Sequence, residues 1–217
     1  MLKKLVCCGL LLVGSVALAE KKAFYVSAGL QYALVKTTIT GSLGFNLPYT
    51  SGQSNMYGFS MEGGYKFFLG KREKRNGFRV YVFYDYGYDN PTFNGARYNN
   101  NVYGVGVDYL FNFINTRDIQ TGFFMGIAFA GSSWNNSGAS YVASLTKYPG
   151  TSINFSYFQI PLRFGVRANV TKHQGFEFGL KIPIVRNYYF RSVTPSGVSG
   201  VTFQRSLVLY ANYVWNF

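Results

Sequence analysis

Residues 206–217, SLVLYANYVWNF, end on a phenylalanine that follows alternating large apolar side chains. Counting back in twos from Phe217 gives one fully apolar face, formed by Trp215, Tyr213, Ala211, Leu209 and Leu207. The positions between them are mixed in character. A period of two is typical of a β-strand whose two faces have different surroundings. Such a strand could face a soluble core or lipid, so the rest of the chain must distinguish the two.

The composition favours strands that separate apolar from polar groups at short range. Aromatic residues make up 19% of the 217 residues and charged residues 13%, against roughly 25% charged in a typical soluble domain. The mean hydropathy is nevertheless only +0.03. Strands that alternate apolar and polar residues explain how a chain rich in aromatics and poor in charge has a mean hydropathy near zero. The length of the chain suits a single all-β domain.

The first twenty residues, MLKKLVCCGLLLVGSVALAE, have the pattern of a secretory signal peptide. Two lysines precede an apolar run that is too short to span a membrane, and Ala17-Leu18-Ala19 supplies small residues for cleavage. We expect a cleaved signal peptide at 1–19 and a barrel domain at 20–217. Both cysteines, Cys7 and Cys8, fall in the signal peptide after an apolar stretch too short to favour a lipoprotein.

The exported chain is basic. Without residues 1–19 it has 19 basic and 8 acidic side chains, a formal charge of +11. In an exported protein this balance favours anionic lipid headgroups or polyanionic surface sugars over nucleic acid. The basic run KREKR at 71–75 is expected to touch such headgroups or to stay solvated.

Eight segments repeat the alternation of the closing stretch. They lie at 23–36, 56–69, 78–86, 103–113, 122–130, 157–167, 176–184 and 206–217. A tilted strand needs roughly 9 to 11 residues to cross a bilayer, whereas strands of soluble sheets have about five or six. No stretch beyond residue 19 approaches 18 consecutive apolar residues. The segments therefore predict membrane-crossing strands.

The connections alternate between long and short. Long ones at 37–55, 89–100, 132–154 and 187–202 are rich in Gly, Ser, Thr and Asn, which predicts mobile, solvent-exposed loops. Short ones have the sequences GKREKRN, NTRD and NVTKHQ. Both patterns predict an all-β fold, an eight-stranded antiparallel transmembrane β-barrel in the bacterial outer membrane with long extracellular loops and short periplasmic turns.

Charged residues fall at mid-strand positions on the face opposite the apolar one. They are Glu62, Lys66, Arg79, Asp85, Asp108, Arg163, Arg167, Glu177 and Lys181. An eight-stranded barrel encloses a space that side chains just fill. We therefore expect a lumen network in which the carboxylates pair with the basic groups.

Five blocks of this chain resemble the Helicobacter outer membrane protein family, which contains porins and adhesins. The blocks are NGFRVYVFYDYGY, NVYGVGVDYLFNF, FQIPLRFGVRANV, GFEFGLKIPIVRNYYF and LYANYVWNF. The longer adhesins carry a large extracellular domain for which this chain has no room, which disfavours host-receptor adhesion. The terminal aromatics also resemble those of bacterial outer-membrane barrels, which implies that Tyr213, Trp215 and Phe217 form part of the signal read by the barrel-assembly machinery.

Few residues offer catalytic or metal chemistry. The only histidine, His173, falls in the turn NVTKHQ on the expected periplasmic side, whereas a barrel enzyme would need it at the outer rim. GVGVD at 104–108 alternates glycine with valine on a strand, which favours small wall residues over a phosphate loop. We expect no catalytic, cofactor or metal site and no cofactor.

Two functions remain open, with an outer-membrane lipid-modifying enzyme as a weaker third. The first is a non-catalytic envelope or surface protein that is monomeric and contacts a host or matrix ligand through its loops; the second is a small-solute porin. Recognition surfaces are rich in aromatics, and those in or beside the loops are Tyr49, Tyr57, Trp134, Tyr141 and Tyr148. The alternative for the loops is a variable solvated surface with no partner. Contact with outer-membrane lipids and phosphorylated lipopolysaccharide is expected through Lys36, Arg97, Lys147 and Arg191.

Overall fold

The computed structural model describes residues 22–41, 47, 49–69, 75–89, 97–115, 119–195 and 197–217. The predicted signal peptide and residues 71–74 of the basic run lie outside these residues. The described elements are β1 (Lys22–Thr40), β2 (Gly52–Leu69), β3 (Asn76–Asp89), β4 (Tyr98–Asn115), β5 (Gln120–Asn136), α1 (Ala139–Ser144), the 3-10 turn η3 (Leu145–Lys147), β6 (Thr151–Ile153), β7 (Ser156–Gln159), β8 (Pro161–Asn169), β9 (Gln174–Pro183), β10 (Tyr188–Thr194) and β11 (Gly197–Asn216).

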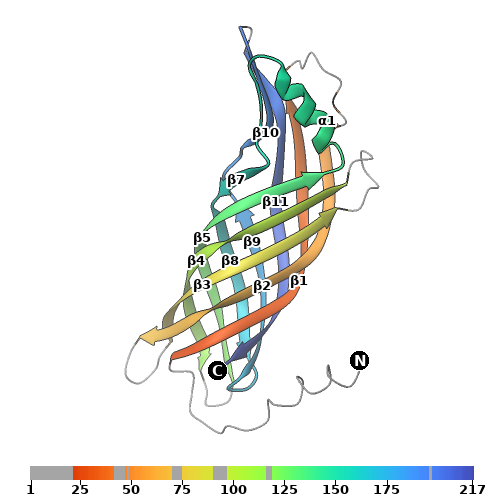
Figure 1. Cartoon of the computed structure of the whole chain (residues 1–217). Coiled ribbons are helices and arrows are strands. Elements are labelled where there is room, and N and C mark those ends of the chain that lie inside the picture. Colours follow the sequence, from red (N-terminus) through yellow and green to blue (C-terminus); the bar gives the residue numbers. More distant parts are fainter. Residues whose placement is uncertain are drawn as a thin grey trace, which may run out of the picture.

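Eight strands form a closed antiparallel ring. The order is β1-β2-β3-β4-β5-β8-β9-β11, and β1 pairs again with β11 to close it. Figure 1 shows the tilted strands, with the C-terminus at the end of the barrel opposite α1 and β10. The prediction of an eight-stranded outer-membrane barrel is confirmed. Among the described residues, no helix is long and apolar enough to cross a membrane.

The alternation in the sequence sets the two faces of the wall. On β1, Phe24 and Leu30 are 67% and 75% exposed, whereas Tyr25 between them is buried. On β11, Leu209 and Tyr213 point outward and Tyr210 points inward, as the closing stretch predicts. Lipid covers the outward apolar residues, which explains why a chain with so many aromatics needs no large apolar core.

Glycines make room for large side chains inside the wall. Gly104 and Gly106 lie in β4, as predicted for small wall residues. Gly106 faces Tyr81 across the ladder, and a Cβ there would lie 2.3 Å from the tyrosine ring. The glycine therefore lets the Tyr81 ring approach β4 closely and reach Asp108, whose Oδ1 accepts from the hydroxyl at 3.2 Å.

The prediction of a single sixth strand is wrong, because the structure divides this segment into β7 and β8. β7 pairs only with β5, and β8 begins at Pro161, which faces Pro183 at the end of β9. Proline lacks the N–H that a regular ladder requires. Two facing prolines therefore end the regular β8–β9 pairing, and above them Ile184 N–H donates to Ile160 O at 3.1 Å.

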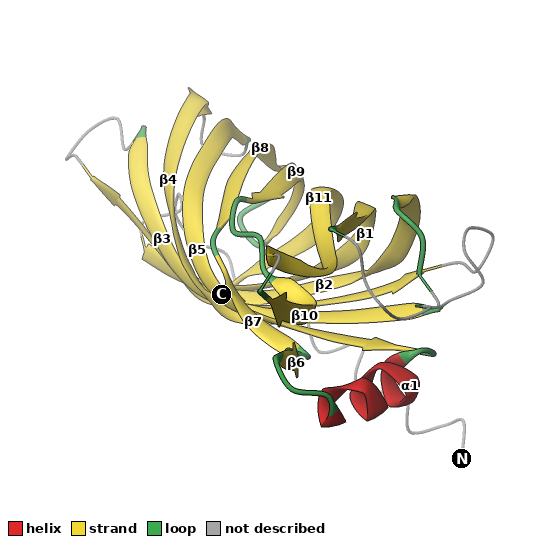
Figure 2. Ribbon diagram, turned by 90° about the horizontal axis from the view of Figure 1, so that it is seen from above, coloured by secondary structure: helices red, strands yellow, loops and turns green. Residues whose placement is uncertain are grey.

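Two of the predicted long loops are largely ordered structure. Residues 132–154 contain the end of β5, α1, η3 and β6, and residues 187–202 form the β10–β11 hairpin. Gly197 has φ +137°, a conformation that favours glycine, in the turn of this hairpin. We call α1, η3, β6, β10 and residues 197–204 of β11 the extracellular tier. Figure 2 shows α1 at the rim, beside β6.

Candidate functional site

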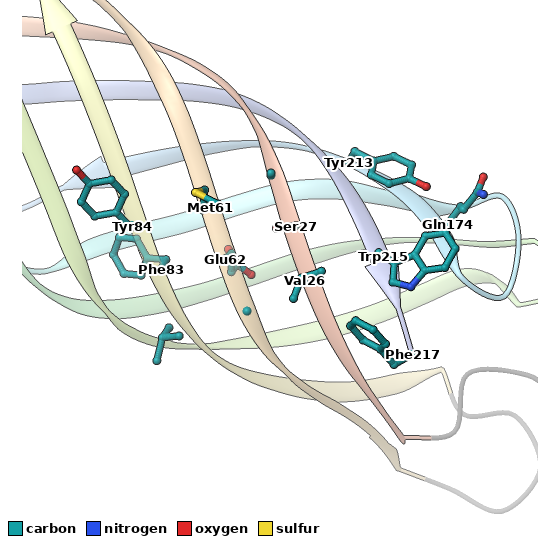
Figure 3. Close-up of a pocket in the computed structure, with 13 residues that line it drawn as sticks. Val26, Ser27, Met61, Glu62, Phe83, Tyr84, Gln174, Tyr213, Trp215 and Phe217 are labelled. Carbon is teal, nitrogen blue, oxygen red and sulfur yellow. The ribbon is translucent and has the colours of Figure 1, made fainter. Parts of the chain in front are cut away.

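Two large hollows lie on the lipid-facing surface. They have volumes of about 960 and 770 Å³ and share Val26, Gly63, Val82 and Phe217. Figure 3 shows Val26, Met61 and Tyr84 around the larger hollow, on the outer side of neighbouring strands. Their linings are mostly apolar, and Gly63 leaves the floor without a side chain. Lipid chains fill such depressions in a membrane, so the search for a site moves inside the barrel.

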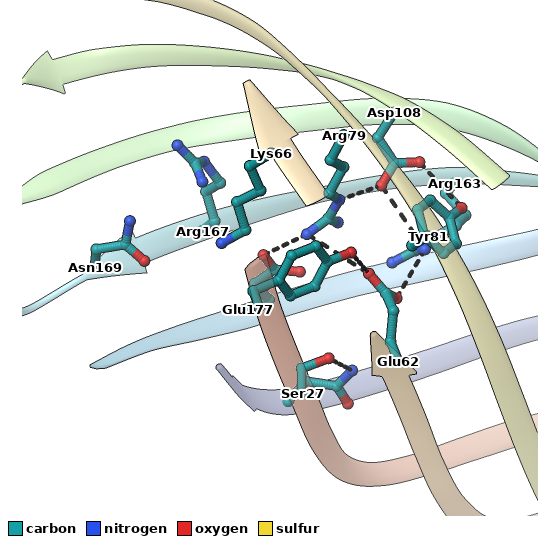
Figure 4. A network of polar contacts seen from close by, with 12 residues as sticks. Ser27, Glu62, Lys66, Arg79, Tyr81, Asp108, Arg163, Arg167, Asn169 and Glu177 are labelled. Carbon is teal, nitrogen blue, oxygen red and sulfur yellow. Dashed lines mark hydrogen bonds and ion pairs between the residues drawn. The ribbon is translucent and has the colours of Figure 1, made fainter. Parts of the chain in front are cut away.

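Arg79 is the centre of an ion-pair layer in the lumen (Figure 4). Its Nε donates to Asp108 Oδ2 at 2.7 Å, and its Nη1 donates to Glu177 Oε1 at 2.6 Å. Glu62 Oε1 lies 3.8 Å from the same Nη1. These residues come from β2, β3, β4 and β9, and all are buried. One arginine thus joins carboxylates from three other strands.

Arg163 of β8 adds a second cation to this layer. Its Nη1 lies 2.9 Å from Glu62 Oε2 and 3.7 Å from Asp108 Oδ2. Its guanidinium also lies 4.3 Å from the centroid of the Tyr81 ring. The hydroxyl of Tyr25 donates to the other oxygen of Glu62. The layer therefore combines ion pairs, hydrogen bonds and cation–π contacts.

The other predicted lumen charges lie above and below this layer. Lys181 Nζ donates to both oxygens of Asp85, at 2.8 and 2.7 Å. Lys66 Nζ donates to Asn216 Oδ1 at 2.8 Å, and Arg167 Nη2 donates to Asn112 Oδ1 at 2.8 Å. All nine predicted residues are buried in the lumen, and the four carboxylates pair with Arg79, Arg163 and Lys181.

Arg205 is a lumen residue that the sequence interpretation missed. It is buried, and its Nη2 and Nη1 donate to Gln31 Oε1 at 3.0 Å and to Asn100 Oδ1 at 3.3 Å. Counting in twos from Phe217 places residue 205 on the lipid face. A β-bulge breaks that count, because Leu34 pairs with Leu207 while Val35 pairs with Arg205. No sequence signal marks this extra residue.

An aromatic plug fills the extracellular part of the lumen. It consists of Phe203 and four surrounding rings whose centroids lie 4.7 Å (Tyr189), 4.9 Å (Tyr98), 5.1 Å (Tyr49) and 5.6 Å (Trp134) from its own. All five are buried and belong to one cluster with Val142 of α1 and Leu145 of η3. Burial raises the pKa of Tyr49, whose protonated hydroxyl donates to Asn136 Oδ1 at 2.5 Å.

The five aromatic residues proposed for recognition divide into three groups. Tyr49 and Trp134 were expected in loop surfaces, but both are buried in the plug. Tyr57 is exposed on the lipid face of β2, and the centroid of its ring lies 5.4 Å from the centroid of the Tyr32 ring. Tyr141 of α1 and Tyr148, which directly follows η3, are 48% and 55% exposed at the extracellular end of the molecule. Only these last two of the five lie where a soluble partner could reach them.

The acidic side chains of the described residues all lie inside the barrel, whereas basic side chains lie both inside and outside. The five carboxylates in the described part of the chain are all buried: Glu62, Asp85, Asp89, Asp108 and Glu177. The four residues predicted to meet lipopolysaccharide, Lys36, Arg97, Lys147 and Arg191, are all exposed. The exposed charges among the described residues are therefore basic.

The C-terminal aromatics lie at the periplasmic end of β11. Tyr213 and Phe217 are exposed on the outer face, and Phe217 N–H donates to Phe24 O at 2.9 Å. Trp215 stacks on His173 with centroids 5.7 Å apart, and His173 Nδ1 lies 2.8 Å from Asn216 O. His173 thus holds the last strand to a turn. Recognition of these aromatics by the assembly machinery stays a prediction.

The described residues provide no arrangement of side chains that could bind a metal ion. No group of three or more His, Cys, Asp or Glu side chains among them could hold a metal ion.

Comparisons with known proteins agree with this architecture. The family model described as Helicobacter outer membrane protein matches residues 60–217. Among solved structures, OprG from Pseudomonas aeruginosa has a TM-score of 0.50 at 10% identity, covering 91% of this chain and 96% of that chain. Neisserial surface protein A has 0.46 at 16% identity, covering 89% and 97%. A major outer membrane protein from Thermus thermophilus has 0.47 at 14%, covering 90% and 99%. No curated protein matches the chain. The identities are low, so the likeness to OprG bears on the fold alone.

Proposed function

Since the chain belongs to the Helicobacter outer membrane protein family and is an integral outer-membrane β-barrel, we propose that it is a sealed, non-catalytic barrel that acts through its extracellular surface. The observation that carries this proposal is the aromatic plug around Phe203, which lies above the ion-pair layer around Arg79. Two successive layers of buried side chains leave the lumen filled. What remains for contact with other molecules is the outside of the barrel and the extracellular tier.

A small-solute porin is the competing function, since the family contains porins. A pore needs a continuous water path along its axis. The plug opposes such a path because its rings come from β4, β5, β10, β11 and the β1–β2 connection, and five closely packed aromatic side chains leave little room for water. The ion pairs below the plug likewise join side chains from facing strands, so they also oppose a continuous water path.

Purified protein should therefore show no stable conductance steps in planar bilayers. The measurement is single-channel recording at neutral pH in potassium chloride, with a known porin reconstituted in parallel as the positive control. Discrete, long-lived steps from protein that shows heat-modifiable gel migration would overturn the sealed barrel and restore the porin function.

The non-catalytic part of the proposal rests on His173. An outer-membrane hydrolase needs its base near a nucleophile at the outer rim, whereas His173 follows β8 in the periplasmic turn and contacts Asn216 O. This geometry suits a structural role at the end of β11 and supports no lipid-modifying reaction.

The extracellular tier is the surface that we propose for contact with a host or matrix ligand. It is fixed to the barrel, because Val142 and Leu145 are buried in the cluster around Phe203 while Tyr141 and Lys147 next to them are exposed. A ligand would therefore meet a rigid aromatic and basic surface. Rigid aromatics provide contact area at a low entropic cost.

Replacing Tyr141, Lys147 and Tyr148 together with serine should reduce attachment of bacteria to host cells or matrix at least severalfold. Their side chains are exposed, so the barrel should still insert. Deleting residues 133–149 would be a poorer test, because it also removes Trp134 and Leu145 from the buried cluster. Arg75→Ser, at an exposed residue beside a periplasmic turn, is the control. Unchanged attachment of the triple variant would reject a ligand at this surface.

A further inference from the structure

A small polar pocket opens on the outer surface of the barrel where β1, β10 and β11 meet. Its volume is about 200 Å³, and its lining consists of Thr38, Thr40, Arg186, Asn187, Tyr188, Thr202 and Gln204. It is separate from the lumen network and from the surface around Tyr141. Its size lies below the roughly 300 Å³ at which sites for drug-sized ligands begin, so it suits a single small polar group.

The ends of regular pairing build this pocket. Thr38 pairs with Thr202 across the β1–β11 ladder, and Tyr188 pairs with Thr202 from the other side. Between Pro183 and Tyr188 the chain leaves the ladder, which places Arg186 beside these hydroxyls. Gln204 Nε2 donates to Pro183 O at 3.2 Å and ties this irregular segment to β11.

The sequence of outward residues gives the height of the pocket relative to the membrane. On β1 the outward positions pass from Leu30, which is 75% exposed, through Leu34 to the exposed Lys36, and then to Thr38 and Thr40. On the adjoining segment, Ile184 is 52% exposed and Arg186 follows two residues later. The pocket therefore lies just above the apolar band, at the level of the outer-leaflet headgroups.

The charge at the pocket is positive and uncompensated. Arg186 is exposed, and every Asp and Glu side chain in the described part of the chain is buried inside the barrel. A second cation flanks the site, because Lys36 pairs with Gln204 on the same outer face. An arginine beside hydroxyl donors is a common way to bind phosphate, because the guanidinium offers two parallel N–H groups and the hydroxyls donate to the remaining oxygens.

We propose that this pocket binds a phosphate group presented at the outer-leaflet surface, with Arg186 as the anchoring cation. Thr38, Thr40 and Thr202 supply hydroxyl donors, and Asn187 and Gln204 contribute amides. The ligand class is a phosphorylated glycolipid headgroup, and free phosphate shares the chemistry that the pocket recognises. This site goes beyond the surface function proposed above and does not depend on it.

The test measures binding of bisphosphorylated lipid A to purified protein in dodecyl maltoside, which carries no phosphate. Arg186→Gln should weaken binding about tenfold or more, the equivalent of one charge-assisted hydrogen bond. Arg186→Lys keeps the positive charge but not the paired N–H donors. Its affinity for lipid A should therefore lie between those of Arg186→Gln and the unaltered protein. Arg75→Gln removes an exposed arginine at the periplasmic end of the barrel, far from the pocket, and should bind like the unaltered protein.

Two further arms identify the source of the phosphate. Dephosphorylated lipid A should bind at least tenfold more weakly than the bisphosphorylated form. Displacement of lipid A by millimolar inorganic phosphate would show that the pocket takes phosphate itself, whereas resistance to it would show that the whole headgroup is required. Equal binding by Arg186→Gln and unaltered protein, both with heat-modifiable migration, would overturn the proposal, as would equal binding of dephosphorylated lipid A.

Discussion

Replacing Arg79 with methionine should lower the free energy of unfolding by about 3 to 5 kcal/mol, the usual cost of removing one partner from a buried ion pair. Arg79 donates to Asp108 and Glu177 at 2.7 and 2.6 Å, and all three side chains are buried. Methionine fills a similar volume but leaves both carboxylates without their shared cation. The measurement is urea unfolding in liposomes, followed by tryptophan fluorescence and gel migration.

Two further variants show whether the ion pairs cause this loss. Arg75→Met removes an exposed arginine four residues earlier in the chain and should cost well under 1 kcal/mol. Adding Glu177→Gln to Arg79→Met should cost less than the sum of the two single changes, because the second change removes a charge that the first left unpaired. A loss below about 1 kcal/mol for Arg79→Met would mean that water screens the layer.

Replacing Phe203 with alanine should also cost about 3 to 5 kcal/mol, which is typical of a buried phenylalanine truncated to alanine. Its ring contacts four other aromatic rings, contributed by three strands and the β1–β2 connection. Two of these rings, Tyr98 and Trp134, are held by the wall strands β4 and β5, so the cluster cannot close over the cavity completely. Urea unfolding measures the loss.

The matched control for this change is Phe158→Ala. Phe158 is 52% exposed on the lipid face, where acyl chains can occupy the space left by its ring. Its truncation should therefore cost clearly less than that of Phe203. Equal losses for both variants would mean that the plug is loosely packed and would weaken the case for a sealed lumen.

The wall of the barrel was predictable from the sequence because the environment of each strand residue follows from its position in the alternating pattern alone. A strand with lipid on one side and packed polar groups on the other must alternate, so Phe24 and Tyr25 already differ in environment by their parity. The same parity placed Arg79 and Glu177 inside the lumen, and a narrow barrel forces such charges to meet.

The errors arose where contacts distant in sequence override the local pattern. Arg205 turns inward because of a bulge opposite Val35, which a count of alternating residues does not register. Trp134 and Tyr49 were read as exposed because Ser, Gly and Asn surround them, yet Phe203 from the last strand buries both. Composition identified the connections, whereas the burial of Trp134 and Tyr49 depends on a partner that lies 69 and 154 positions further along the chain.

The ion-pair layer also has a consequence for how the barrel is assembled. Its members come from β2, β3, β4, β8 and β9, and Arg79 is separated from Glu177 by 98 positions in the sequence. A half-formed sheet ending at β5 would carry Glu62, Arg79 and Asp108 without the counter-ions from β8 and β9. Such charges are costly to expose to hydrocarbon. We therefore expect the inner face of a growing sheet to stay hydrated until its seventh wall strand, β9, has joined, and release into the bilayer to come late in assembly.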